Sequence, residues 1–304
     1  MLRTLRIKNG KLVENGGEAP DVFVYAAPDE SERKYLVEEL KIDEHTLASS
    51  LDPDELSRLE FEPEHAAIIF KRPKHYLASD NFLFKVLSTG VFVFKDKLVI
   101  VVGEDAPLFE GKPFMKILSI QDIILKLLYR SISHFVEHLK AIDALAADIE
   151  KQINISMENK YLLDMFTLEK SLVYYINGIT SNGALIEKLK NNAARMGFTP
   201  ENVEFIDDIH IENNQCRIQA DTYSQVLSNL MDARVSIVSN NLNIRIKALT
   251  IITIAVMLPT FVVSLFSMNV RIPLAQYGHA FWIITTMAAM TTTIVAFLWW
   301  KRHW

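Results

Sequence analysis

Seven residues recur along one face of an apolar segment near the C-terminal end of the chain, and most of them carry a hydroxyl or an amide. They are separated by seven, three, four, three, four and three residues: Asn243, Thr250, Thr253, Met257, Thr260, Ser264 and Ser267. At about 100° per residue of helix, they fall within an arc of roughly 120°. Hydroxyls in a bilayer avoid lipid, so this stripe predicts contact with another helix or with a water-filled lumen.

Two interpretations of the stripe stay open. Serine and threonine can donate back to their own helix and pack at small-residue interfaces, which is a structural role. Alternatively the stripe lines a pore, but a chain with two spans cannot enclose a lumen by itself. The pore interpretation therefore requires a homo-oligomer. Asp232, about four helical turns below the membrane, would then be repeated as a ring of carboxylates at the inner mouth, as in cation pathways.

A second group of candidate ligands is acidic. Four carboxylates recur at spacings of three and four and therefore share one helix face: Glu201, Glu204, Asp208 and Glu212. They can be a solvated face whose acids sit near the positive N-terminus of a helix. The alternative is a site for a divalent cation, because hard cations prefer carboxylate oxygens.

A third pattern resembles a catalytic motif. His134, Glu137 and His138 match the H-x-x-E-H string of one class of zinc proteases, and a helix would place both imidazoles on one face. The spacing of the other histidines indicates no third ligand. We therefore interpret the motif as part of an exposed helix face, and we expect no enzymatic activity.

Composition excludes several other functions. The formal net charge is −5 and no basic stripe is present, which argues against nucleic acid as a partner. Gly111-Lys112-Pro113 lacks the spacing of a phosphate-binding loop, so an ATP-driven pump and an organic cofactor are not indicated. The single Cys216 excludes a disulfide framework and a cysteine metal cage.

The stripe and the acidic face both belong to one long predicted helix, from Thr199 to Asn269. Thr199-Pro200-Glu201 is a good helix start, with a capping hydroxyl, a proline at the first helical position and an acid in the first turn. The segment from Ala248 to Val270 has no charged residue and is long enough to cross a bilayer, which needs roughly 20 residues. Pro259 predicts a kink within that span.

The N-terminal part predicts a mixed α+β domain. Expected strands cover Val22–Tyr25, His65–Phe70, Asn81–Leu87, Gly90–Phe94 and Lys97–Val102, the last two joined by a hairpin at Lys95-Asp96. Expected helices cover Glu30–Leu40 and Asp43–Leu51, and Asp52–Glu55 is expected to turn into a further helical turn. Apolar residues at helical spacing then predict two antiparallel helices, Ile120 to about Asn154 and Glu158 to about Met196, with Gly197 as a left-handed cap.

A second span from about Tyr277 to Trp300 has aromatic residues at both edges. Arg245 and Lys247 precede the first span, and Lys301 and Arg302 follow the second. Because basic residues tend to stay on the cytoplasmic side, this pattern predicts a multi-pass protein of the cell membrane with both termini in the cytoplasm. The expected domains are a cytoplasmic α/β domain (1–115), a helical hairpin (116–198), a stalk helix (199–269) that continues into the first span (about 248–269), an external loop (270–279), the second span (280–300) and a basic tail (301–304).

Five short segments form a recognisable set: 232–243 (DARVSIVSNNLN), 247–252 (KALTII), 267–269 (SMN), 50–58 (SLDPDELSR) and 301–304 (KRHW). They resemble the CorA family of magnesium channels, and the resemblance spans nearly the whole chain. The resemblance implies a homopentamer with a funnel-shaped cytoplasmic domain and with the first span around a shared pore. It also implies that Mg²⁺ is the transported ion. The expected partners are thus further copies of the chain, divalent metal ions and membrane lipid.

The resemblance also implies roles for particular residues. Asn269, with Ser267 and Met268, matches the Gly-Met-Asn signature whose asparagine ring receives the hydrated ion. Polar rings along the pathway correspond to Asn243, Thr260 and Asp232, and apolar constrictions that could gate by dewetting correspond to Ile246, Leu249 and Met257. In the family, cytoplasmic magnesium binds acidic sites between subunits and favours closure. Here the corresponding candidates are Asp208 first, then Glu204 and Glu212.

Two departures from the family pattern leave alternatives open. Ser267 replaces the signature glycine, and Arg271 stands in an external loop that lacks the acid often found there. A transporter of Zn²⁺, Co²⁺ or Ni²⁺ on the same fold is one alternative. A membrane-tethered scaffold or regulatory subunit that conducts nothing is the other.

Overall fold

The computed structural model describes residues 1–14, 19–155, 159–270 and 277–301. Within them the chain forms two compact units, Met1–Met231 and Asp232–Trp304. Residues 271–276 of the predicted external loop, Arg271 among them, and residues 302–304 of the predicted basic tail lie outside the described residues.

The first unit is built on a seven-stranded sheet with the order β2-β1-β3-β7-β6-β5-β4. Its strands are β1 (Leu2–Lys8), β2 (Lys11–Glu14), β3 (Val22–Ala26), β4 (Arg58–Phe61), β5 (Ala66–Pro73), β6 (Val86–Val93) and β7 (Leu98–Val102). Only β3 and β7 pair in parallel, and the other neighbours are antiparallel. The hairpin predicted at Lys95-Asp96 is confirmed, because the Phe94 N–H donates to the Lys97 carbonyl at 2.9 Å.

Helices cover both faces of the sheet. The helices α1 (Glu30–Glu38) and α2 (Glu44–Leu51) pack on one face, and α3 (Ile120–Ile155) and α4 (Asn159–Asn191) pack on the other. The central strand β7 is buried along its whole length and sends alternate side chains into the two cores, as the two-residue period of a strand requires. This arrangement confirms the predicted α+β class.

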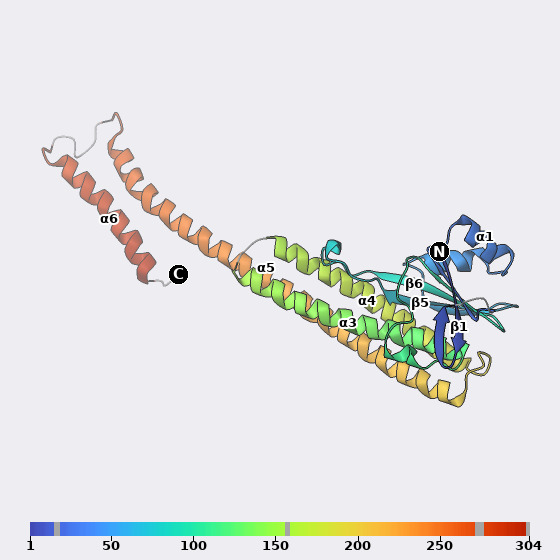
Figure 1. The fold of residues 1–304 in the computed structure, drawn as a ribbon. Helices are drawn as coiled ribbons and strands as arrows, with labels where there is room; N and C mark the ends of the chain where they lie inside the picture. The colour runs from blue at the N-terminus through green and yellow to red at the C-terminus, as the bar shows by residue number, and fades with distance from the viewer. Residues whose placement is uncertain (15–18, 156–158, 271–276, 302–304) are drawn as a thin grey trace. The chain divides into compact units, whose positions relative to one another are not determined.

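The long helix α5 (Pro200–Phe266) begins as the sequence predicts. The Asn202 N–H donates to Thr199 Oγ1 at 3.2 Å, and the Thr199 N–H donates back to Asn202 Oδ1 at 3.1 Å. Gly197 adopts φ +70° just before this start, a left-handed conformation that favours glycine. In the first unit, α3 and α4 run side by side with α5 (Figure 1), and α5 contributes Ile206, Ile209 and Leu227 to their common core.

The second unit contains the C-terminal part of α5 and the helix α6 (Ala280–Lys301). Each has an apolar stretch long enough to cross a membrane, and those stretches are almost wholly exposed in the single chain. Apolar helices with no protein cover need lipid or further copies around them. The chain therefore has two candidate membrane spans, as predicted.

Several details of the N-terminal prediction are wrong. The strands expected at Asn81–Leu87 and Gly90–Phe94 are one strand, β6. It begins only at Val86, because Asn81 and Phe82 are in the left-handed region, at φ 47° and 65°, where a strand cannot run. No further helical turn follows Asp52–Glu55, and the chain instead enters β4 at Arg58. The strands β1, β2 and β4 were not expected, and all three lie at or next to a sheet edge.

Candidate functional site

The candidate pore residues all belong to the second unit. Asn243, Ile246, Leu249, Met257 and Thr260 are exposed positions on α5. The helix ends at Phe266, three residues earlier than predicted, because the Ser267 N–H bonds to the Ser264 carbonyl at 3.2 Å in a tighter turn. The signature residues Ser267, Met268 and Asn269 therefore follow the helix end as exposed residues of a bend.

Part of the polar stripe lines a hollow of about 650 Å³ on the surface of α5. All of its lining residues come from α5, on both sides of Pro259: Ile252, Thr253, Val256, Met257, Thr260, Phe261 and Ser264. The hollow thus brings together Thr253, Met257, Thr260 and Ser264 from the stripe. It does not include Asn243 or Asp232, which lie further toward the N-terminal end of α5.

The threonine hydroxyls of the stripe donate to their own helix. Thr250, Thr253 and Thr260 donate to the carbonyls four residues earlier at 2.8, 2.9 and 2.7 Å. This observation bears out the first half of the structural interpretation, in which such hydroxyls bond back to the helix. It does not exclude a wet lumen, since a hydroxyl oxygen that donates its proton still has lone pairs that accept.

The acidic face lies in the first unit, near the start of α5. Glu201, Glu204, Asp208 and Glu212 are all exposed. Among the described residues no three or more carboxylates, histidines or cysteines converge as a metal site. The four acids follow one helix face, so a cation held by one of them would need ligands from outside this chain.

The histidine pair is not on an exposed face, so that interpretation is wrong. His134 and His138 are half-buried between α3 and neighbouring elements, with ring centroids 4.3 Å apart. His138 Nδ1 lies 2.6 Å from Tyr175 Oη on α4, and the ring of His75 approaches His134 at 6.3 Å. Burial lowers the pKa of His134 to about 3 and that of His138 to about 4, and neighbouring cationic groups add to the shift.

The surroundings of this pair differ from those of a hydrolytic zinc site. His138 Nδ1 lies within hydrogen-bond distance of the Tyr175 hydroxyl, which fixes the ring in the packing of α3 against α4. The described residues offer no third ligand arranged around a metal. The motif therefore has a structural explanation.

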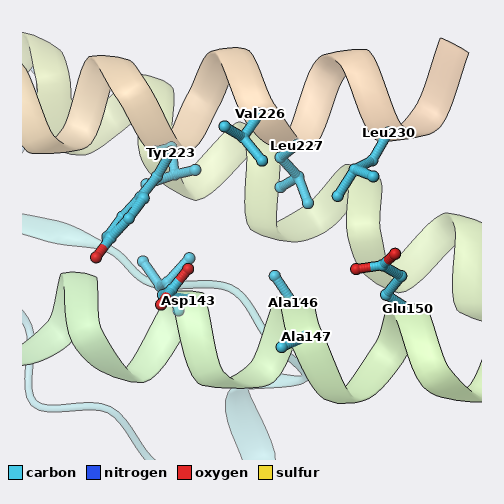
Figure 2. Close-up of a pocket in the computed structure, with 10 residues that line it drawn as sticks. Asp143, Ala146, Ala147, Glu150, Tyr223, Val226, Leu227 and Leu230 are labelled. Carbon is cyan, nitrogen blue, oxygen red and sulfur yellow. The ribbon is translucent and has the colours of Figure 1, made fainter. Parts of the chain in front are cut away.

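A groove between α3 and α5 in the first unit was not predicted from the sequence. Its volume is about 110 Å³, and Figure 2 shows Ala146 and Ala147 of α3 facing Val226 and Leu227 of α5. The carboxylates of Asp143 and Glu150 flank the two alanines along α3 (Figure 2). The small side chains of α3 leave this space, and Leu172 of α4 also lines it. Residues that meet from three helices are not marked by any periodic pattern in the sequence.

Comparison with known proteins assigns the family. Residues 23–302 match the model of the CorA-like Mg²⁺ transporter protein family. A relative, the cobalt/magnesium transport protein CorA of Methanocaldococcus jannaschii, is 23% identical over 292 residues, which cover 91% of this chain and 89% of the relative.

Solved structures support the fold. The complete structure of the CorA magnesium transporter from Methanocaldococcus jannaschii superposes with a TM-score of 0.81 at 18% identity, over 98% of this chain and 97% of that one. The cytoplasmic domain of ZntB from Vibrio parahaemolyticus superposes with a TM-score of 0.60 at 10% identity, over 78% of this chain and 98% of that one. With a family match that extends from the sheet through both apolar helices, the chain belongs to the CorA-like family of divalent-cation transporters, which are membrane proteins.

Proposed function

We propose that the protein is a passive Mg²⁺ channel, a homopentamer whose pore is lined by the polar stripe of α5. The observation that carries the proposal is the hollow on α5, in which Thr253, Met257, Thr260 and Ser264 share one exposed face. A single chain cannot enclose this face, whereas copies arranged about an axis would turn it inward. Family membership supports the same assignment.

The hydration of the ion explains why this lining suits it. Mg²⁺ gives up its water reluctantly, so oxygens that accept hydrogen bonds from its water shell serve better than direct ligands. In the proposed channel the Asn269 ring receives the hydrated ion outside, and Thr260, Asn243 and Asp232 form successive polar rings toward the inside. Between them Ile246, Leu249 and Met257 form apolar constrictions that close the pore by dewetting.

No fuel is needed for uptake through such a pore. With both termini in the cytoplasm, a doubly charged ion that enters gains about 4.6 kcal/mol at 100 mV, since each charge gains about 2.3 kcal/mol. The acidic face of α5 then meets cytoplasmic Mg²⁺. We assign Asp208, with Glu204 and Glu212 in support, to a regulatory Mg²⁺ site completed by a neighbouring subunit.

Flux into liposomes under an inside-negative potential tests the proposal. We expect Mg²⁺ influx that rises with the potential and that falls by about tenfold in Asn269→Ala and in Asn243→Ala, each of which removes a ring of amides. Asn241→Ala is the matched control, because Asn241 is on the opposite side of α5 from Asn243. Flux unchanged in both ring variants would contradict the assigned pathway, and no divalent flux at all would favour a non-conducting scaffold.

A second candidate ion has an observation in its favour. The relative from Methanocaldococcus jannaschii is named as a cobalt/magnesium transport protein, and Ser267 replaces the glycine of the family signature in this chain. Competition between Mg²⁺ and Co²⁺, Ni²⁺ or Zn²⁺ in the same liposomes separates the alternatives. We expect cobalt hexaammine, which resembles the hydrated ion, to block a Mg²⁺ channel, and an absence of block would favour a channel for the other metals.

A further inference from the structure

We propose that Thr253 forms a further ring of residues that contact the hydrated ion, because its hydroxyl offers the pore only hydrogen-bond acceptors. The inference rests on the proposed function and adds to it a ring that the signature residues do not include. Thr253 Oγ1 lies 2.9 Å from the Leu249 carbonyl oxygen. A carbonyl oxygen cannot donate, so the hydroxyl proton points to the helix and the oxygen lone pairs are left for whatever fills the hollow.

The same geometry recurs two helical turns further along the span. Thr260 Oγ1 lies 2.7 Å from the Val256 carbonyl oxygen, and both threonines line the hollow. Seven residues separate them, which is about 10.5 Å along a helix and brings them back to the same face. Met257 lines the hollow between them, and its thioether has no proton to donate. The stretch from Thr253 to Thr260 therefore presents acceptors and no side-chain donor.

An acceptor-only lining distinguishes ions by the direction in which their water shells point. Water molecules around a cation turn their oxygens inward and present O–H groups outward, which these threonine oxygens accept. Water molecules around an anion direct hydrogens inward, and an anion without its water needs donors. An asparagine ring carries both a carbonyl and an NH₂ group and can serve either. The threonine rings thus add selectivity for hydrated cations without any formal charge in the bilayer.

Two variants separate the effect of the Thr253 hydroxyl oxygen from that of its side-chain shape, and a third variant is the control. Thr253→Val keeps the branched side chain and removes the oxygen, Thr253→Ser keeps the hydroxyl and removes the methyl group, and Thr285→Val is a matched control on α6. Thr285 donates to its own helix in the same way, to the Phe281 carbonyl at 2.8 Å, but it does not line the hollow. Mg²⁺ influx is measured in liposomes, with the oligomer checked by mass.

We expect Thr253→Val to lower Mg²⁺ influx by about tenfold, because every subunit of the ring loses an acceptor. Thr253→Ser and Thr285→Val should both retain influx close to that of the wild type. If Thr253→Val conducts as well as Thr285→Val, or if Thr253→Ser loses as much influx as Thr253→Val, the inference is overturned while the proposed function stands. A wild-type protein that conducts no divalent cation overturns the proposed function, and this inference with it.

Discussion

One residue of β5 ties the sheet to α3 and α4, the two helices that pack on one of its faces. The backbone N–H of Lys71 donates to Asn182 Oδ1 at 2.8 Å, and its carbonyl accepts from Asn182 Nδ2 at 2.8 Å and from Ser131 Oγ at 2.6 Å. Asn182 belongs to α4 and Ser131 to α3, and both are buried. Buried amides and hydroxyls that are all paired fix one arrangement of the elements they join. Side chains from two helices thus set the position of this strand.

The Lys71 side chain is held just as closely. Its ammonium donates to the Pro53 carbonyl and to Ser88 Oγ, both at 2.8 Å, and burial lowers the pKa of Lys71 to about 8. Asp52, Asp54 and Glu55 are the neighbouring acids that oppose this shift. A charged lysine is accepted inside the unit because the preceding acidic turn surrounds it.

The histidine pair predicts a loss of stability in mild acid. His134 and His138 have pKa values of about 3 and 4 in the folded protein, below the ordinary value of about 6.5. As the pH falls below about 6.5, the unfolded chain binds protons that the folded protein refuses, so the free energy of unfolding decreases. The loss is up to about 1.4 kcal/mol per pH unit for each histidine, and it continues down to the folded pKa values.

Thermal unfolding between pH 7 and pH 5 measures this effect. We expect His134→Gln, which stays neutral, to lose less stability over that range than the wild type does. His45→Gln is the control, since His45 is exposed. His75, Arg130 and Arg72 face the pair and oppose its protonation, whereas Glu137 favours it at His138. Equal slopes in the wild type and His134→Gln would rule out this source of acid sensitivity.

At the scale of elements, long periodic helices were predictable and short edge strands were not. The helix expected from Ile120 to about Asn154 is α3, Ile120–Ile155, because apolar residues recur at helical spacing throughout it. The interior residues of β1, charged and apolar alike, are all partly buried, so no alternation marks this strand. Its position depends on pairing with β3, which the local sequence does not encode. The candidate pore stripe was likewise found from periodicity, since all its members except Ser267, which follows the helix end, lie on α5.

Contacts between distant segments explain what the sequence could not show. His75 follows β5, His134 belongs to α3 and Tyr175 to α4, so their approach depends on the packing of the whole first unit. The Lys71 network and the groove between α3 and α5 are of the same kind. Local spacing predicts which residues share one face of a helix or strand. It does not predict which other helix or strand packs against that face.

The groove between α3 and α5 predicts a stabilising substitution. Ala146 faces a space of about 110 Å³ next to the buried Leu227. In Ala146→Leu the added carbons would be removed from water in an existing gap, so we expect the free energy of unfolding to rise by about 1 kcal/mol. Ala144→Leu is the control, because Ala144 is exposed on the far side of α3. Thermal unfolding of the full-length protein provides the measurement, and destabilisation by Ala146→Leu would mean that the groove cannot accept a side chain.

At the scale of the whole molecule, the proposed oligomer would give the acidic face a second copy with which to hold a cation. Its carboxylates are exposed, and the described residues do not gather them around a cation. Acids that line one helix face are about 5–6 Å apart from their neighbours, and an ion bound to a single one of them stays largely hydrated. A regulatory site on Asp208 would therefore form only where another subunit supplies further oxygens, and binding would hold the two subunits together.

Because an ion bound between subunits stabilises the arrangement that forms the site, Mg²⁺ in the cytoplasm should favour the closed channel. Asp208→Asn removes the charge that holds the ion, and we expect influx in this variant to continue at internal Mg²⁺ concentrations that stop the wild type. The concentration for half inhibition should rise by about tenfold. Glu201→Gln is the matched control, because Glu201 precedes Asp208 by seven residues, about two helical turns. Inhibition at the same concentration in Asp208→Asn and the wild type would show that regulation, if present, depends on other groups, while the pathway through α5 would be unaffected.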